Sequence, residues 1–237
     1  MPQITHTDYY SHHLGISIPV EITGHYGYPI LMFPTSQGSY TQNHDFNLNS
    51  SIHHLIDAGK VKLYNIQTID KLSFYNNNLH PRERIHNYEL FIEFLIKEYI
   101  PYLQNLHKTH RLAVAGASFG GYHAANFAFR FPDLISHLIC LSGAFTIRSF
   151  MEGYSSDQVY FNCPREFVKE DQASKYQHMH IVLSTSDQDI CLEPTKEMSA
   201  ILNSKGINHW YDEQKWISHD WPLWRMVFPK FMDTYFG

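Results

Sequence analysis

The feature that most constrains the fold is a short apolar run that leads directly into a glycine-rich turn and then a helix. Residues 112–115 (Leu-Ala-Val-Ala) have the uniform apolar character of a strand buried on both faces. Gly116-Ala117-Ser118-Phe119-Gly120-Gly121 follows at once, and the next helix carries a face of alanines at 124, 125 and 128. A G-x-S-x-G sequence between strand and helix is the turn that exposes a nucleophilic serine.

The two glycines that flank the serine have a steric reason. A Cβ atom at Gly116 or Gly120 would collide with a neighbouring strand or helix, while the turn itself holds Ser118 in a strained backbone conformation. The alternative is a glycine-rich helix N-terminus that binds phosphate, but the chain lacks the GK[ST] or GxGxxG pattern of such sites. We therefore predict that Ser118 is a catalytic nucleophile.

Short apolar runs alternate with segments of helical period along the chain, which predicts an α/β fold with a mainly parallel sheet and helices on both faces. The expected strands are residues 17–22, 29–33, 62–66, 111–115, 137–141, 180–183 and 208–212. A helical stripe runs from Tyr88 to Tyr99, and Pro101 should end or kink that helix. Pro194 and Gly206 should bracket another helix.

The chain length and composition favour one domain. The 237 residues exceed the usual domain size but suit one large α/β domain, so we expect a single unit over residues 1–237. Aromatic residues make up 15% of the chain. An aromatic-rich stretch at 145–176 interrupts the alternation, and long connections of this kind often form lids, so we expect a small lid-like cap insertion there.

Charge and cysteine usage exclude several classes of protein. The formal net charge is −5 with no basic stripe, which argues against nucleic-acid binding. Three cysteines without CxxC spacing argue against a disulfide framework and fit a reducing compartment. The N-terminal segment lacks a basic and an apolar region of secretory type, and no apolar run reaches membrane-spanning length. We therefore expect a cytoplasmic protein without a membrane partner.

A nucleophilic serine needs a base and an acid that orients the base. In this architecture the chain order is Ser, Asp or Glu, then His, and His219 lies beyond the last expected strand. The acid should follow the strand at 180–183, where Asp187 and Asp189 are both candidates by spacing.

Acyl chemistry also needs donors for an oxyanion. One donor should be the backbone N–H of Phe119, and the other should come from the loop at residues 34–38, with the Ser36 N–H favoured and the Gln37 N–H next. Gly38 fits a turn with positive φ.

Paired histidines are the remaining candidates for special chemistry. His178 and His180 fall on one face of an expected strand, but no third and fourth ligand accompanies them at a typical spacing. We therefore expect no metal site.

Four segments carry a resemblance to a known family. They are residues 33–38 (FPTSQG), 116–126 (GASFGGYHAAN), 160–162 (YFN) and 219–224 (HDWPLW). Together they resemble the putative esterases of the α/β-hydrolase superfamily, the wider family of esterase D and the mycolyl transferases. The resemblance implies a cofactor-free Ser–His–Asp carboxylester hydrolase and, through a G-x-x-D-like segment, places the acid on Asp189. Ser186 stands where a glycine is common, which keeps Asp187 as an alternative.

The expected reaction is hydrolysis of a small or short-acyl ester, because the chain has little length to spare for a large cap. The candidate walls of the substrate pocket are Gln37, Tyr40, Phe119, Tyr122, Tyr160 and Trp221. The alternatives are a thioesterase of the S-formylglutathione type, an acyltransferase, a non-catalytic binding protein with an idle triad, and a metal-dependent hydrolase. The only expected partner is the ester substrate, and a homo-oligomer is left open.

Overall fold

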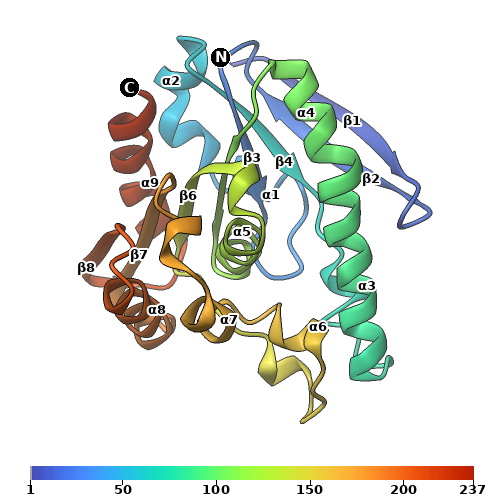
Figure 1. Ribbon diagram of the computed structural model, residues 1–237. Coiled ribbons are helices and arrows are strands. Elements are labelled where there is room, and N and C mark those ends of the chain that lie inside the picture. The colour runs from blue at the N-terminus through green and yellow to red at the C-terminus, as the bar shows by residue number, and fades with distance from the viewer. Residues whose placement is uncertain (1) are drawn as a thin grey trace.

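A computed structural model describes residues 2–237 and shows a twisted central sheet with helices on both faces (Figure 1). The sheet has eight strands in the order β1-β2-β4-β3-β5-β6-β7-β8. The pairs β1–β2 and β2–β4 are antiparallel, and all other pairs are parallel. The strands are β1 (Ile4–Ser11), β2 (Ile16–Thr23), β3 (Tyr28–Phe33), β4 (Val61–Ile66), β5 (Leu112–Ala117), β6 (Ile135–Leu141), β7 (His180–Gln188) and β8 (Trp210–Ser218). The predicted α/β architecture is confirmed.

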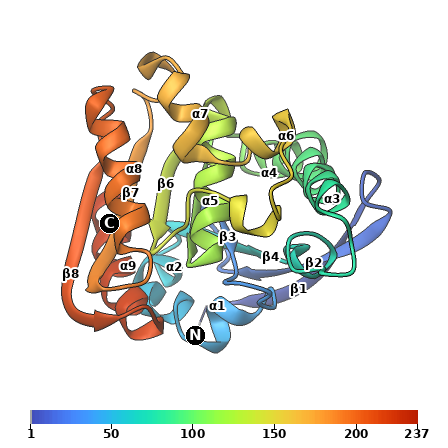
Figure 2. The same ribbon diagram turned by 90° about the horizontal axis from the view of Figure 1, so that it is seen from below.

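Helices lie on both sides of the sheet in the view from below (Figure 2), and an apolar layer packs between the helices and each face. One layer lies under α3 (Pro81–Phe94), α4 (Ile100–His107), α5 (Phe119–Arg130), α7 (Pro164–Glu170) and α8 (Leu192–Ser204). The other lies under α2 (His53–Asp57) and α9 (Trp221–Phe236). Two single-turn helices, α1 (Gln42–Asp45) and α6 (Asp157–Tyr160), occupy connections.

Strand β5 shows how the sequence divides between the layers. Leu112 and Val114 enter the layer under α5, while Ala113, Ala115 and Ala117 enter the layer under α9. Successive side chains of a strand point to opposite faces, so a fully apolar strand is what two covered faces require.

The edge strand β1 has no counterpart among the predicted strands. Its residues from Ile4 to Asp8 are all exposed, because β1 pairs only with β2 at the margin of the sheet. Only Tyr9 and Ser11 pack inward, which is too few residues to give the alternation of apolar and polar positions that marks a strand.

The helix that contains Tyr88 does not end at Pro101. A π-helical turn over Leu95–Tyr99 joins α3 to α4, and Pro101 lies in the first turn of α4. A proline within a continuous helix removes one backbone hydrogen bond, and the π turn directly before Pro101 is where the regular ladder is interrupted. The boundaries expected from Pro194 and Gly206 are confirmed by α8, which ends at Ser204 before Gly206 adopts φ +67°.

The segment at 145–176 is more regular than its sequence suggested. It contains α6, α7 and two 3₁₀ turns at Arg148–Phe150 and Ala173–Lys175. Many of its apolar side chains are buried in the layer under α5 and α7, namely Phe145, Ile147, Met151, Val159, Cys163, Phe167, Val168 and Tyr176. This burial anchors the segment to the body of the fold.

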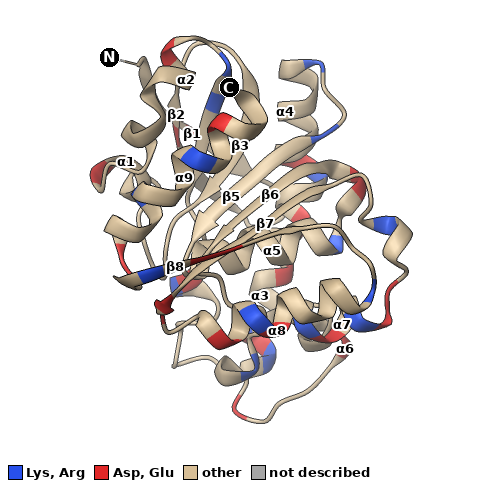
Figure 3. Ribbon diagram, turned by 90° about the vertical axis from the view of Figure 1, so that its left-hand side faces the viewer, with Lys and Arg blue, Asp and Glu red and all other residues tan. Residues whose placement is uncertain are grey.

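Charged residues are interspersed on the face drawn in Figure 3, where basic positions on α8 and α9 alternate with acidic ones. Several of them pair directly, as Lys230 does with Asp212. The three cysteines are free thiols. Within residues 2–237, no helix combines the length and the apolar character needed to cross a membrane.

Candidate active site

Ser118 lies at the tight turn between β5 and α5, with φ 56° and ψ −124°. The flanking glycines are required by close backbone contacts. A Cβ at Gly116 would lie 2.3 Å from the Gly120 carbonyl oxygen, and a Cβ at Gly120 would lie 2.5 Å from the carbonyl oxygens of Phe33 and Pro34. The predicted steric role of these glycines is confirmed, and the strained serine is held at the carboxyl end of the sheet.

The structure brings Ser118, His219 and Asp189 into one hydrogen-bonded line. His219 Nε2 lies 2.9 Å from Ser118 Oγ, and His219 Nδ1 lies 2.6 Å from Asp189 Oδ1. The three residues follow β5, β8 and β7 respectively, whose parallel carboxyl ends meet at the same edge. The Asp189 side chain is fully buried and the His219 side chain is 15% exposed. A substrate therefore approaches the three residues from the side of Ser118.

Asp187, the other acidic candidate, lies elsewhere. Its Oδ1 accepts a 2.8 Å hydrogen bond from the backbone N–H of Trp216 on β8, and it does not contact His219. Trp216 has φ 62°, so this carboxylate stabilises a left-handed residue near the end of the strand.

Asp189 is held in its ionised form. Burial opposes ionisation, but hydrogen bonds from His219 and from the backbone N–H of Cys191, together with the nearby Ser142 hydroxyl, lower the pKa of this carboxyl. Asp189 Oδ2 is buried and has no hydrogen-bond partner among the described residues. Burial, reinforced by Asp189, raises the pKa of the neighbouring Cys191 thiol to about 12.

Trp224 contacts both His219 and Ser142. Its indole Nε1–H donates a 2.9 Å hydrogen bond to Ser142 Oγ, and its ring meets His219 edge-on. Trp224 is buried in the apolar layer between α9 and the sheet.

The two predicted oxyanion donors both have amides available. Phe119 is the first residue of α5, where backbone N–H groups have no intrahelical acceptor. Among the described residues, nothing accepts a hydrogen bond from the Ser36 N–H, although its neighbours Thr35, Gln37 and Gly38 are all bonded. The contact of Gly120 with the Phe33–Pro34 backbone brings this loop against the serine turn.

Two details of the loop differ from the expectation. The Gln37 N–H, the second choice as donor, is bound to Asp70 Oδ2 at 2.9 Å and is not free. Positive φ falls on Gln37, at 55°, and not on Gly38. A Cβ at Gly38 would lie 2.0 Å from Gln42 Oε1, so it would displace the Gln42 side chain from its bonds to Thr35.

An aromatic wall beside the serine involves two residues that sequence patterns did not single out. The rings of Phe119, Tyr75 and Phe150 are mutually in contact, with centroids 5.0–5.5 Å apart. The Tyr75 hydroxyl also donates to Ser36 Oγ at 2.9 Å. Tyr75 follows β4, and its position past the carboxyl end of a central parallel strand is the signal that could have identified it.

Other predicted pocket residues lie less favourably. Tyr122 is fully buried, with its hydroxyl on the Asn162 carbonyl, so it cannot line an accessible pocket; its ring supports that of Phe119 at 4.9 Å instead. Trp221 is 8% exposed and stacks on Phe46. Tyr40 packs edge-on against His6, and Tyr160 packs against Phe161, with no contact to the three site residues.

The two histidines do not share a strand face as expected, because β7 begins at His180 and His178 lies in the turn before it. His178 bonds to the Pro132 carbonyl oxygen, and His180 stacks on His137 at 4.7 Å. Over residues 2–237, one group of three side chains has metal-ligand spacing, and it consists of Asp189, Cys191 and His219 at the site itself.

A protein-family model described as "Putative esterase" matches residues 11–233 of the sequence. The chain belongs to this esterase family. Membership of this family makes the chain an esterase, and its fold is that of the α/β-hydrolases. No curated protein sequence matches it.

Solved structures share the fold of this esterase at low sequence identity. A fluorophosphonate-binding serine hydrolase of Staphylococcus aureus is 13% identical with a TM-score of 0.78, covering 100% of this chain and 99% of its own. An S-formylglutathione hydrolase of the same organism is 12% identical with a TM-score of 0.78, covering 100% and 97%. A ferulic acid esterase of the anaerobic fungus Anaeromyces mucronatus is 17% identical with a TM-score of 0.74, covering 100% and 91%.

Proposed function

We propose that this esterase hydrolyses small or short-acyl carboxylic esters through Ser118, His219 and Asp189, by way of an acyl-enzyme. The observation that carries the proposal is the line of two hydrogen bonds, 2.9 Å from Ser118 to His219 and 2.6 Å from His219 to Asp189. A buried carboxylate on Nδ1 leaves Nε2 as the acceptor that faces the serine hydroxyl.

In the acylation step, Ser118 Oγ attacks the ester carbonyl carbon and His219 Nε2 takes the serine proton. The Oγ–C bond forms, and the carbonyl oxygen becomes an oxyanion. When the tetrahedral intermediate collapses, the bond from carbon to the alkoxy oxygen breaks and His219 gives its proton to the leaving alcohol. Asp189 stabilises the imidazolium without taking the proton.

We assign the oxyanion to the N–H groups of Phe119 and Ser36. The Phe119 amide belongs to the same turn as the nucleophile, and the Ser36 amide is the unpaired one in the adjoining loop. Donors that are already fixed before the reaction cost no reorganisation when negative charge develops.

In the deacylation step, His219 removes a proton from a water molecule that attacks the acyl carbon. The Oγ–C bond breaks, His219 returns the proton to Ser118, and the carboxylic acid leaves. No metal or organic cofactor takes part in this scheme.

A short acyl group fits the surroundings of the serine. Phe150 belongs to the insertion at 145–176, and with Phe119 and Tyr75 it forms an apolar wall close to the nucleophile. We propose that this insertion is a fixed cap of the single domain, because its apolar side chains are buried in the core layer.

The test is an ester panel from p-nitrophenyl acetate to decanoate, with wild type and Ser118→Ala side by side. We expect turnover that falls with acyl length in the wild type and near-complete loss in Ser118→Ala. Ser50→Ala, at an exposed serine, is the matched control and should retain full activity. Equal turnover in wild type and Ser118→Ala would refute the assignment, as would failure of a fluorophosphonate to label Ser118.

Two further arms separate the reaction types. A thioester of glutathione and an alcohol acceptor are added to the panel, because thioesterases and acyltransferases can use the same triad. Preference for the thioester, or transfer to the alcohol in place of hydrolysis, would revise the substrate class while leaving Ser118 as the nucleophile.

The free thiols support a cytoplasmic location, since reducing compartments keep cysteines unpaired. Fractionation of cells that produce the native chain, followed by activity assay, tests this proposal. Recovery of the activity in an oxidising compartment would contradict it.

A further inference from the structure

A second buried aspartate, Asp70, bonds to the loop at residues 34–38, which we call the oxyanion loop. It begins the 3₁₀ turn Asp70–Leu72 that follows β4, and its side chain is 1% exposed. Its two carboxylate oxygens have separate partners. Oδ2 accepts the Gln37 N–H at 2.9 Å, and Oδ1 lies 2.9 Å from His123 Nε2.

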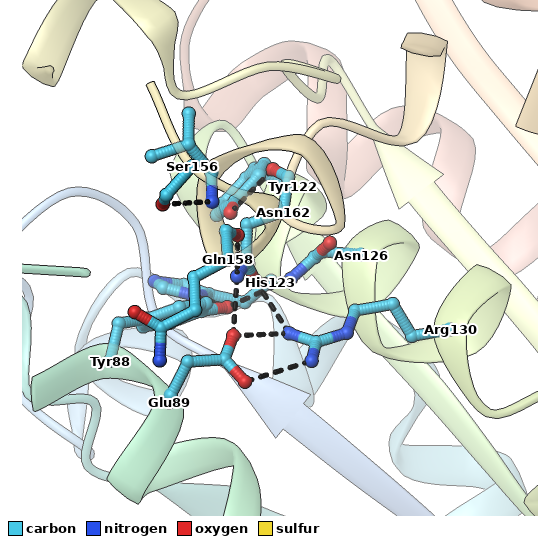
Figure 4. A network of polar contacts seen from close by, with 10 residues as sticks. Tyr88, Glu89, Tyr122, His123, Asn126, Arg130, Ser156, Gln158 and Asn162 are labelled. Carbon is cyan, nitrogen blue, oxygen red and sulfur yellow. Dashed lines mark hydrogen bonds and ion pairs between the residues drawn. The ribbon is translucent and has the colours of Figure 1, made fainter. Parts of the chain in front are cut away.

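His123 fixes Asp70 from the nucleophile's own helix. It lies on α5, its side chain is fully buried, and its Nδ1 lies 3.0 Å from the Tyr88 hydroxyl. Burial raises the pKa of the Tyr88 hydroxyl far above neutrality, so Tyr88 keeps its proton and donates it to Nδ1. His123 Nε2 then carries the hydrogen and donates it to the carboxylate. Tyr88 from α3 and His123 from α5 lie together in Figure 4.

Asp70 compensates for a strained residue of the loop. Gln37 has φ 55°, a left-handed conformation that a side chain with Cβ adopts at a cost. The Gly38 N–H closes the turn on the Thr35 carbonyl oxygen, so Ser36 and Gln37 are its two central residues. The orientation of the peptide groups within such a turn depends on the backbone angles of these residues. A bond from the Gln37 N–H to a fixed carboxylate therefore determines where the adjoining Ser36 N–H points.

Apart from Asp70, one bond reaches the centre of the loop, from the Tyr75 hydroxyl to Ser36 Oγ, and it holds a side chain and not a peptide group. Gln42 Oε1 accepts from Thr35, and Gln67 bonds to the Gly38 carbonyl oxygen and the Tyr40 amide. These bonds hold the two ends of the loop. Asp70 is the acceptor for its strained centre.

We propose that Asp70, itself fixed by His123 and Tyr88, is a positioning residue that presents the Ser36 N–H to the oxyanion. This proposal rests on the proposed function, because it assumes that the Ser36 amide is the second oxyanion donor. The side chains of Asp70 and His123 are fully buried, and the far nitrogen of His123 is occupied by the Tyr88 hydroxyl, so the pair acts through the loop and not on the substrate.

The test is Asp70→Asn, which preserves the shape of the side chain and removes its charge. An asparagine offers one acceptor oxygen, so it cannot accept from Gln37 and His123 through separate oxygens as the carboxylate does. We expect kcat per titrated active site to fall about 10- to 100-fold with KM little changed, somewhat less than the loss of about 10²- to 10³-fold for removal of an oxyanion donor. The concentration of active sites is measured by fluorophosphonate labelling. A variant that is partly unfolded therefore does not show a falsely low kcat.

The affinity for a boronic acid is a second measurement, which a purely structural role of Asp70 would leave unchanged. When Ser118 adds to an alkylboronic acid, the boron becomes a tetrahedral anion that places an oxygen in the oxyanion hole. We expect Asp70→Asn to weaken binding of this analogue by about the same factor as kcat/KM, while KM for the ester stays unchanged.

Two variants of His123 test the hydrogen bonds that connect Asp70 to α5. His123→Gln can still donate to Asp70 and accept from Tyr88, so it should recover most of kcat, while His123→Leu should lose about as much as Asp70→Asn. Glu89→Gln is the matched control. Glu89 forms a semi-buried bidentate pair with Arg130 on the same helices but does not reach the loop, so its loss should lower stability and leave kcat per active site unchanged (Figure 4).

The outcomes are distinguishable from those of the proposed function. If Ser118→Ala keeps its activity, the catalytic assignment itself is wrong. If Ser118→Ala is inactive but Asp70→Asn retains wild-type kcat and boronate affinity, only the positioning role is refuted. An equal loss of kcat in Glu89→Gln would also refute it, because the effect would then follow from general destabilisation.

Discussion

The indole ring of Trp224 meets the imidazole of His219 edge-on, with centroids 5.2 Å apart and ring planes at 89°. The same indole donates its N–H to Ser142, whose hydroxyl stands beside Asp189. One side chain of α9 thus contacts the base directly and reaches the surroundings of the acid through a serine. The residue immediately behind a catalytic imidazole limits its rotation, so Trp224 is expected to fix the orientation of His219.

Replacement of Trp224 by phenylalanine tests this arrangement. Trp224→Phe keeps an aromatic ring near His219 but removes the N–H donor to Ser142. We expect a decrease in the free energy of unfolding of about 1–3 kcal/mol, because Ser142 is buried. We also expect a several-fold lower kcat with unchanged KM, measured by ester hydrolysis and urea unfolding.

A double-mutant cycle with Ser142→Ala isolates the hydrogen bond. Residues in direct contact show coupling of about 0.5–3 kcal/mol, so the double variant should lose less stability than the sum of the single losses. Strict additivity of the two losses would show that Trp224 stabilises the site by packing alone.

The two acidic residues after β7 should differ sharply in effect. Asp189→Asn removes the charge that fixes the His219 tautomer, and we expect kcat to fall by about 10⁴-fold. Asp187→Asn leaves an acceptor for the Trp216 N–H and should retain activity close to that of the wild type. The pair is compared in one ester assay, and a larger loss for Asp187→Asn would reverse the assignment of the acid.

Asp189 should also make stability depend on pH. Hydrogen bonds outweigh burial and lower its pKa in the folded state, so the folded protein holds the ionised form more strongly than the unfolded chain does. The resulting contribution to the free energy of unfolding is fully present above the ordinary carboxyl pKa. It is lost as the pH falls through the lowered pKa of the folded state. The stability difference between wild type and Asp189→Asn should therefore be smaller at about pH 3 than at about pH 7 in urea unfolding. A difference that grows in acid would contradict the lowered pKa.

Much of the site could be predicted from the sequence because its key features are local. The serine turn, its two glycines and the order of Ser118, Asp189 and His219 follow from short segments after strands. The parallel strands then bring those segments to one edge of the sheet. The choice between Asp187 and Asp189 needed the resemblance to a family, because the residues lie two apart on a strand end and spacing cannot separate them.

What could not be predicted depends on contacts between distant segments. The role of Asp70 arises from a bond to Gln37 and another to His123, 33 and 53 residues away. The sequence predicts Tyr122 as a pocket wall, but its position on α5 directs the ring into the core. Hydrophobic patterning reports which residues are buried on one element, and it does not report which elements a polar side chain joins.

Substitution of Gly120 tests whether catalysis needs the close approach of α5 to the oxyanion loop. In Gly120→Ala, the new Cβ would lie 2.5 Å from two backbone carbonyl oxygens, so α5 and the oxyanion loop must move apart. We expect a loss of about 1–3 kcal/mol in stability and a large loss of kcat. Gly206→Ala is the control, because Gly206 has φ +67° with nothing within 4 Å of a Cβ, and it should cost about 1–2 kcal/mol without affecting kcat. A Gly120→Ala variant with normal kcat would show that the approach is not needed for catalysis.

The group formed by Asp189, Cys191 and His219 predicts how the enzyme responds to zinc. One ligand atom from each residue lies within 4.8 Å of the others, and nitrogen, sulfur and oxygen donors of this kind bind Zn²⁺. Bound zinc would occupy the imidazole that must accept the serine proton, so it should inhibit the enzyme. The pKa of Cys191 is raised to about 12, and the metal must displace that proton, so inhibition should strengthen as the pH rises.

Cys191→Ser is the variant that checks this prediction. It removes the thiolate ligand while leaving Ser118, His219 and Asp189 in place, so activity without metal should persist and a higher zinc concentration should be needed for half-inhibition. Ester hydrolysis is measured across a zinc titration, with a chelator added at the end to restore activity. A metal-dependent hydrolase would behave in the opposite way, because the chelator alone would abolish turnover of the wild type.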